Sequence, residues 1–398
     1  MSLPSLGGGG PSEPQPDIPF SLGMDVGAPN LSRATPTGDD AVFGERLVAA
    51  LAKDAPPGWH SMAATFSLTV GHQTALVIFA TAEDEYQTTP SQEAFGLVRE
   101  QRDLSASTGR GPWWRLAVSV QQAGAPVIEV DHAEQPFGAN FLFPPDAYRA
   151  DFAAYPDRDV PLWLAAHAFH EGRQHRTPEH AVQQSHSRRS DVAPDDQWPS
   201  LDVMWARWSA LAAVFASMTP GFGPGMAPGI AVFEAATHSG STLVRLPGDR
   251  AVLSGGVFDS HELKSTYIDG AELPDLYAGA PIWVGDATLN VRLETGMLSF
   301  CWWYERGHWH RGQSPDAVAS AGAVPAVAST DDTANAIVRA ISADQSANLV
   351  AVAEAFVGAV ETGTVTSTLV ESLLPRSHGY DVDAALVSLS VAGRFDGR

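Results

Sequence analysis

Residues 300–312, FCWWYERGHWHRG, constrain the fold of this chain more than any other stretch. They contain three of its eleven Trp, its single Cys and two of its thirteen His. Alternate side chains of a strand lie on opposite faces of a sheet, and here both sets are apolar. One set comprises Phe300, Trp302 and Tyr304, and the other comprises Cys301 and Trp303. The pattern predicts a central strand covered on both faces, followed by a short loop and a second strand.

The same stretch allows a chemical interpretation. His308 and His310 alternate in the second strand, so their rings would lie on one face and could bind zinc, with Cys301 or Glu305 as a third ligand. Both further ligands belong to the preceding strand, so their approach depends on the strand register. Aromatic packing across the hairpin explains these residues without a metal. We therefore predict no metal and no cofactor, with His308 and His310 as the only metal candidates.

The charge of the chain restricts its partners. With 24 basic and 46 acidic side chains, its formal net charge is −22. Such a charge disfavours nucleic acid and anionic membranes and favours basic partners. The N-terminus lacks the pattern of a signal peptide, and no apolar run is long enough for a transmembrane helix, so we expect a cytoplasmic protein. A single Cys excludes an intramolecular disulfide, and the oligomeric state is left open.

At 398 residues the chain is longer than one ordinary domain. Its composition predicts a disordered Pro/Gly-rich arm (1–40), an α+β domain (41–168), a polar His/Arg-rich linker (169–197), a second α+β domain (198–325) and a helical C-terminal segment (326–398). Both α+β domains show the order helix, two strands, helix, two strands. We therefore predict a duplicated unit, each copy an antiparallel sheet with helices packed on one face.

Within the second domain, two local predictions follow from turn and strand signals. Residues 287–294 and 297–305 are expected to pair as strands across Thr295-Gly296. The Gly- and Pro-rich residues 220–229 are expected to form a loop.

The sequence shows no catalytic motif that we can assign. His167, His170, His175, His180 and His186 gather near the linker, but the run HEGRQH does not have the His spacing of a helical zinc hydrolase. Neither a G-x-S-x-G elbow nor a phosphate-binding loop occurs. We predict a solvated linker here and no catalytic residues.

Residues 109–165 carry a more specific pattern. GRGPWWRLAVSVQQAGAPVIEVDHAEQPF and the following FPPDAYRADFAAYPDRDVPLWL resemble the YezG-type immunity family. The matching positions are Gly111, Trp113, Asp131, Pro136, Phe137, Tyr148, Asp151, Tyr155, Pro156, Pro161 and Trp163. The order of elements extends the resemblance over about residues 41–165. The family's Tyr-Pro-Arg reads Tyr155-Pro156-Asp157-Arg158 here, a departure from its pattern.

The resemblance implies a non-enzymatic antitoxin, an immunity protein that binds a cognate polymorphic toxin and occludes its active site. One branch of the family neutralises an NAD-degrading mycobacterial exotoxin, and the composition of this chain has an actinobacterial character. We expect toxin contact on the acidic hairpin, at Gln121, Gln122, Glu129, Asp131, Glu134 and Gln135. The motif residues Gly111, Trp113, Tyr148, Asp151, Tyr155, Pro156 and Trp163 are expected to be structural.

Two other functions remain open from the sequence. The chain could be a small-molecule-binding or hydrolytic enzyme with a site between the two domains that uses His308 and His310. It could also be a secretion-system scaffold or chaperone that docks through the arm and the second domain. Stoichiometric zinc in the purified protein would favour the enzyme.

Overall fold

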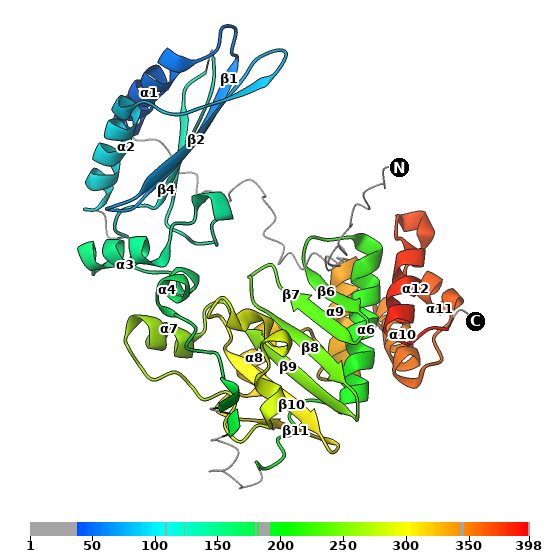
Figure 1. Cartoon of the computed structure of the whole chain (residues 1–398). Coiled ribbons are helices and arrows are strands. Elements are labelled where there is room, and N and C mark those ends of the chain that lie inside the picture. Colours follow the sequence, from blue (N-terminus) through cyan, green and yellow to red (C-terminus); the bar gives the residue numbers. More distant parts are fainter. Residues whose placement is uncertain are drawn as a thin grey trace, which may run out of the picture. The chain divides into compact units, whose positions relative to one another are not determined.

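The computed structural model describes residues 38–107, 110–122, 124–179, 181–182, 192–342 and 346–396, and the chain divides into two compact units, Met1–Phe143 and Pro144–Arg398 (Figure 1). Each unit contains an antiparallel sheet with helices packed on it, which confirms the predicted α+β class. The predicted arm lies outside the described residues as far as residue 37, and residues 38–40 begin the first helix.

The first unit is a five-stranded sheet with two helices on one face (Figure 1). Its elements are α1 (Gly38–Leu51), a short 3-10 helix (Ala52–Asp54), β1 (Ser61–Leu68), β2 (Gln73–Ala80), β3 (Glu85–Thr88), α2 (Gln92–Ser105), β4 (Arg115–Gln121) and β5 (Val127–Asp131), in the sheet order β3-β2-β1-β4-β5. Ser91 caps α2 by accepting a hydrogen bond from the backbone N–H of Ala94. Leu47, Phe66 and Val98 are fully buried between the helices and the sheet.

The second unit is larger and its sheet has six strands. The helices are α3 (Pro145–Ala154), α4 (Leu162–Phe169), α6 (Leu201–Met218), α7 (His261–Ile268), α8 (Ala317–Ser320), α9 (Thr330–Ile341), α10 (Ala347–Thr362), α11 (Ser367–Leu373) and α12 (Val382–Val391). The strands are β6 (Gly223–Ala227), β7 (Ile230–Glu234), β8 (Gly240–Leu246), β9 (Arg250–Gly256), β10 (Phe300–Glu305) and β11 (His308–Arg311), in the order β11-β10-β9-β8-β7-β6. α9 to α12 confirm the predicted helical C-terminal segment.

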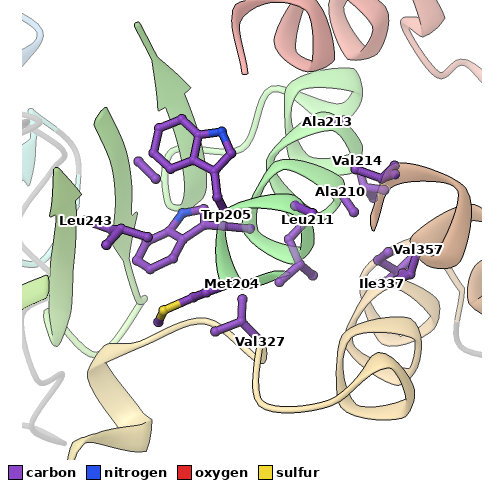
Figure 2. Close-up of a cluster of buried hydrophobic side chains, with 14 of the residues drawn as sticks. Met204, Trp205, Ala210, Leu211, Ala213, Val214, Leu243, Val327, Ile337 and Val357 are labelled. Carbon is purple, nitrogen blue, oxygen red and sulfur yellow. The ribbon is translucent and has the colours of Figure 1, made fainter. Parts of the chain in front are cut away.

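The six-stranded sheet is covered on both faces around β10. On one face, α6 lies between the sheet and the C-terminal helices, and its Trp205 and Leu211 are buried in a single apolar cluster with Leu243 of β8 (Figure 2). That cluster also contains Trp302 of β10. Cys301 belongs to a second cluster on the other face, formed with the irregular segment 276–298. The prediction that β10 is apolar on both sides is confirmed, because all five of its first residues are buried.

The predicted pairing around 287–305 is wrong. Residues 287–293 form two 3-10 helices, Ala287–Leu289 and Val291–Leu293, and β10 pairs with β9 instead. β9 ends in Gly255-Gly256, and a Cβ on Gly256 would lie 2.0 Å from the carbonyl oxygen of Met297. Close approach of the 297 backbone therefore requires glycine there, and this glycine pair hid the strand from the sequence pattern.

Two further predictions about the second domain are also wrong. The residues expected to form a loop, 220–229, contain the edge strand β6, which pairs with β7. The predicted duplication fails in the topology, because the strand that follows α2 pairs with β1, whereas the strand that follows α7 pairs with β9. The two sheets therefore differ in strand connectivity, although both are antiparallel.

The boundary between the units lies at 143/144, upstream of the predicted linker 169–197. α3 and α4, which we expected in the first domain, belong to the second unit, where α4 packs against α7. The buried amide of Gln174 donates to Leu298 O at 2.7 Å and accepts from Leu298 N at 3.2 Å. These two hydrogen bonds join this part of the expected linker to the second unit. They also satisfy the buried amide, which would be costly to leave without partners. His180 and His186 lie outside the described residues.

Candidate functional site

The first sheet has one face that α1 and α2 do not cover, which we call the helix-free face. Side chains that point toward the helices, such as Phe66 and Leu116, belong to the buried core, so their alternate neighbours define the opposite face. The helix-free face comprises Ser61, Ala63 and Thr65 of β1, Leu76, Ile78 and Ala80 of β2, Glu85 and Gln87 of β3, Ala117, Ser119 and Gln121 of β4, and Val127 and Glu129 of β5. None of these side chains is buried.

The strand register places these residues in rows across the sheet. One row crosses all five strands, from Gln87 through Ile78, Ala63 and Ser119 to Val127. The two middle strands carry short side chains, and their neighbours β2 and β5 carry the aliphatic ones. A partner could therefore approach the backbone of the middle strands closely while its own apolar groups contact Ile78 and Val127.

One end of this face is closed by the chain that follows β5. Arg115 donates from Nε to Asp131 Oδ2 at 2.8 Å, and its guanidinium stacks over the Phe137 ring at 4.4 Å. The backbone N–H of Ala133 donates to the other oxygen of Asp131 at 2.7 Å. Burial raises the pKa of Asp131, and the neighbouring Arg115 opposes that shift. These groups are buried, so this end of the sheet offers no binding surface.

Asp131, which we expected among the toxin contacts, is therefore buried in an ion pair rather than exposed for contact. Of the other members, Gln121 and Gln122 are exposed at the β4–β5 turn, and Glu129 is half-buried in the middle of β5. Glu134 and Gln135 are exposed beyond the opposite end of β5, where Glu134 forms an ion pair with Arg110. The structure does not bring the set together: Gln121, Glu129 and Asp131 lie on this side of the sheet, but Asp131 belongs to its buried end.

The motif residues of the resemblance fall into both units. Trp113 in the first unit and Tyr148, Asp151 and Trp163 in the second are buried. Arg158, which follows Asp157, donates to Asp151 at 2.6 Å and forms a buried ion pair with it. The remaining three differ: Gly111 has φ +73°, Tyr155 is half-buried and Pro156 is exposed.

His308 and His310 have local partners in the second unit. The Nδ1 atom of His308 lies 2.8 Å from Asp196 Oδ2, and the other oxygen of Asp196 accepts from the backbone N–H of Trp309 at 3.0 Å. The His310 ring stacks on Trp303, with centroids 5.8 Å apart and an interplanar angle of 19°. Its Nδ1 lies 3.2 Å from Val192 O. Through these contacts both imidazole rings connect the edge strand β11 to neighbouring segments of the second unit.

The expected third ligands do not complete a metal site. Cys301 has no exposed surface, and burial raises the pKa of its thiol. Glu305 pairs with His308 across the hairpin, directly beside the turn at residues 306–307. Within the described part of the chain, no three His, Cys, Asp or Glu side chains come together as metal ligands.

A hollow of about 450 Å³ lies between α1 and α2, on the other side of the first unit from the helix-free face. Its lining is mixed in charge and includes Arg46, Lys53, Glu93 and Glu100. Lys53 and Glu93 form an ion pair across it, and both side chains are more than half exposed. Such a surface ion pair contributes little, and the apolar side chains of the lining are limited to Ala49, Ala50 and Leu97.

None of the helices in the described ranges is long and apolar enough to cross a bilayer. Comparison with protein-family models and with curated proteins finds no match to this chain. The helix-free face is the feature that the sequence reasoning missed, and its signal was the alternation in SMAATFSL of β1, where the residues at 61, 63 and 65 are small or polar.

Proposed function

We propose that this chain is a non-enzymatic immunity protein that captures a toxin on the helix-free face of its first unit. The single observation that carries the proposal is a sheet face spanning five strands whose side chains remain open to solvent. The half-buried Leu76, Ile78 and Val127 give this face apolar side chains that a protein partner could cover.

The acidic charge of the chain supports a partner with a cationic surface. Glu85 and Glu129 lie on opposite margins of the face, and the exposed Glu83 and Asp84 stand at the β2–β3 turn beside it. A toxin that binds an anionic substrate needs a cationic pocket, and an acidic surface accelerates encounter with such a pocket. An NAD-degrading toxin, the target that the YezG-type resemblance suggests, meets this description.

The test is capture of the toxin encoded beside this chain. The C-terminal domain of a large secreted protein from the neighbouring reading frame would be co-expressed with the full chain. We expect co-purification, protection of the cells and inhibition of the toxin's activity. Failure to bind or to protect would refute the proposal.

Matched variants locate the surface. Ala63→Arg and Ser119→Arg place a long cation on the helix-free face, whereas Ala49→Arg places the same group on the exposed side of α1. We expect the first two to weaken capture at least tenfold and the third to leave it unchanged. Equal behaviour of all three would show that capture occurs elsewhere on the chain.

A further inference from the structure

The two edge strands of the first sheet differ in how they are protected. β3 is four residues long, and its Glu85, Tyr86 and Gln87 are exposed. β5 reads VIEVD, and its first four residues are all half-buried. Natural sheets guard their edges with charges, prolines and short strands. β3 therefore presents exposed side chains to solvent, whereas β5 presents half-buried aliphatic ones with Glu129 as the charge among them.

The apolar core of the first unit also continues to the β5 edge. Ile128 and Val130 pack against the core from β5, and Val48 does so from α1, yet all three remain partly exposed. α1 comes close to this edge at Gly44, where a Cβ would lie 2.9 Å from Cδ1 of Ile128. Apolar side chains of the core therefore reach solvent at the β5 edge, and an added strand would cover them.

We propose that β5 accepts an extended segment of the partner protein as a sixth strand, with a Lys or Arg opposite Glu129. Side chains opposite Ile128 and Val130 would be aliphatic and would lie on the α1 side of the sheet. Backbone hydrogen bonds supply the affinity of such strand addition, and the alternate side chains supply its specificity. This inference rests on the proposed function, because the added strand would extend the helix-free face that captures the toxin.

The negative charge of Glu129 favours a partner strand with a basic residue over a second copy of this chain. In a two-fold pairing of β5 with a second copy centred on Glu129, that carboxylate would lie directly opposite its own copy, and like charges in this position are destabilising. Arg115 does not neutralise Glu129, because it is already paired with Asp131. The formal net charge of −22 on each chain further opposes self-association.

The experiment uses the full chain and a synthetic capped peptide, SRVKVTS. In the antiparallel register its Lys faces Glu129 and its two Val face Ile128 and Val130. We expect millimolar peptide to slow amide hydrogen exchange in residues 127–131. The matched control is the same peptide with N-methylated backbone amides, which has the same side chains but cannot form the ladder. Equal protection by the control peptide, or protection only at other segments, would overturn the proposal.

Charge reversal tests the register. Glu129→Lys should weaken binding of the Lys peptide about fivefold and strengthen binding of a peptide with Glu in its place by a similar factor. Circular dichroism of the variant checks that it is folded. A chain that forms dimers by sedimentation, with β5 protected in the absence of peptide, would show that a second copy occupies the edge and would overturn the assignment.

The toxin domain separates this inference from the function on which it rests. If Ser119→Arg abolishes capture while Glu129→Lys does not alter it, the proposed function stands and the added strand is refuted. If the wild-type chain captures no toxin, the proposed function fails, and the peptide experiment still decides whether β5 accepts a strand. If both variants weaken capture and the Lys peptide protects residues 127–131, the face and the edge act together, as we propose. Weaker capture without that protection would refute the added strand, because Glu129 also lies on the face.

Discussion

The two sheets of this chain use their faces differently. In the second unit, β10 has apolar clusters on both sides, and its residues from Phe300 to Tyr304 are all buried. In the first unit, β1 is also central in its sheet, yet Ala63 is exposed and Ser61 and Thr65 are half-buried. A sheet covered on both faces contributes mainly stability, and one covered on a single face keeps a surface for binding. On this difference we place the proposed binding role in the first unit.

The largest expected effect comes from the covered sheet. Trp302→Ala removes a fully buried indole from the cluster that joins β10 to α6. We expect a loss of about 4 kcal/mol in the free energy of unfolding, from lost burial and the cavity that remains. Guanidinium denaturation followed by circular dichroism measures it. A loss below about 1 kcal/mol would mean that β10 is not covered on both faces.

A somewhat smaller loss is expected at the closed end of the first sheet. Asp131→Ala leaves the guanidinium of Arg115 buried without its carboxylate. We expect destabilisation of about 3 kcal/mol, because an unpaired buried charge is costly. The double variant Arg115→Met/Asp131→Leu should recover most of this loss. If Asp131→Ala instead leaves stability unchanged and abolishes toxin capture, the residue is a contact after all.

The α+β class and the two apolar sides of β10 could be predicted from the sequence, because each depends on local residue patterns. The strands β6 and β9 were not, since their glycines serve packing against distant segments rather than strand propensity. The Arg115–Asp131 pair was within reach: the turn at Gln122–Pro126 sets the hairpin register that places them opposite each other. Treating Asp131 as a surface acid overlooked that register.

The helix-free face could be foreseen only in part. Alternation along β1 shows that one set of side chains is smaller and more polar. It indicates that the helices cover the apolar set, but not that the other set stays uncovered, because that depends on the path of distant segments. The acidic residues of the β4–β5 hairpin therefore determined which contact surface we expected from the sequence. The uncharged Ala63, Ser119 and Ile78, in the middle of the face, were not included in it.

A pair of identical substitutions compares the two sheets directly. Leu243→Ala in β8 truncates a side chain with no exposed surface, and Leu76→Ala in β2 truncates a half-buried one on the helix-free face. We expect losses of about 3 and about 1 kcal/mol, so the two should differ by about 2 kcal/mol. Denaturation of both variants measures this difference. Equal losses would show that Leu76 is already covered and that the helix-free face is not open.

The smallest effect is expected at the β11 edge, where the sequence suggested a metal. His308 and Asp196 are both about half exposed, so His308→Ala should cost less than about 0.5 kcal/mol at neutral pH. The hydrogen bond with His308 lowers the pKa of Asp196. A carboxyl group whose pKa is lower in the folded state stabilises the fold at every pH above its unfolded-state pKa. This stabilisation is lost as the pH falls through the folded-state pKa. His308→Ala should therefore raise the Asp196 pKa toward its ordinary range, which carboxyl NMR titration measures. A large loss of stability together with stoichiometric zinc in the wild-type chain would instead restore the metal interpretation.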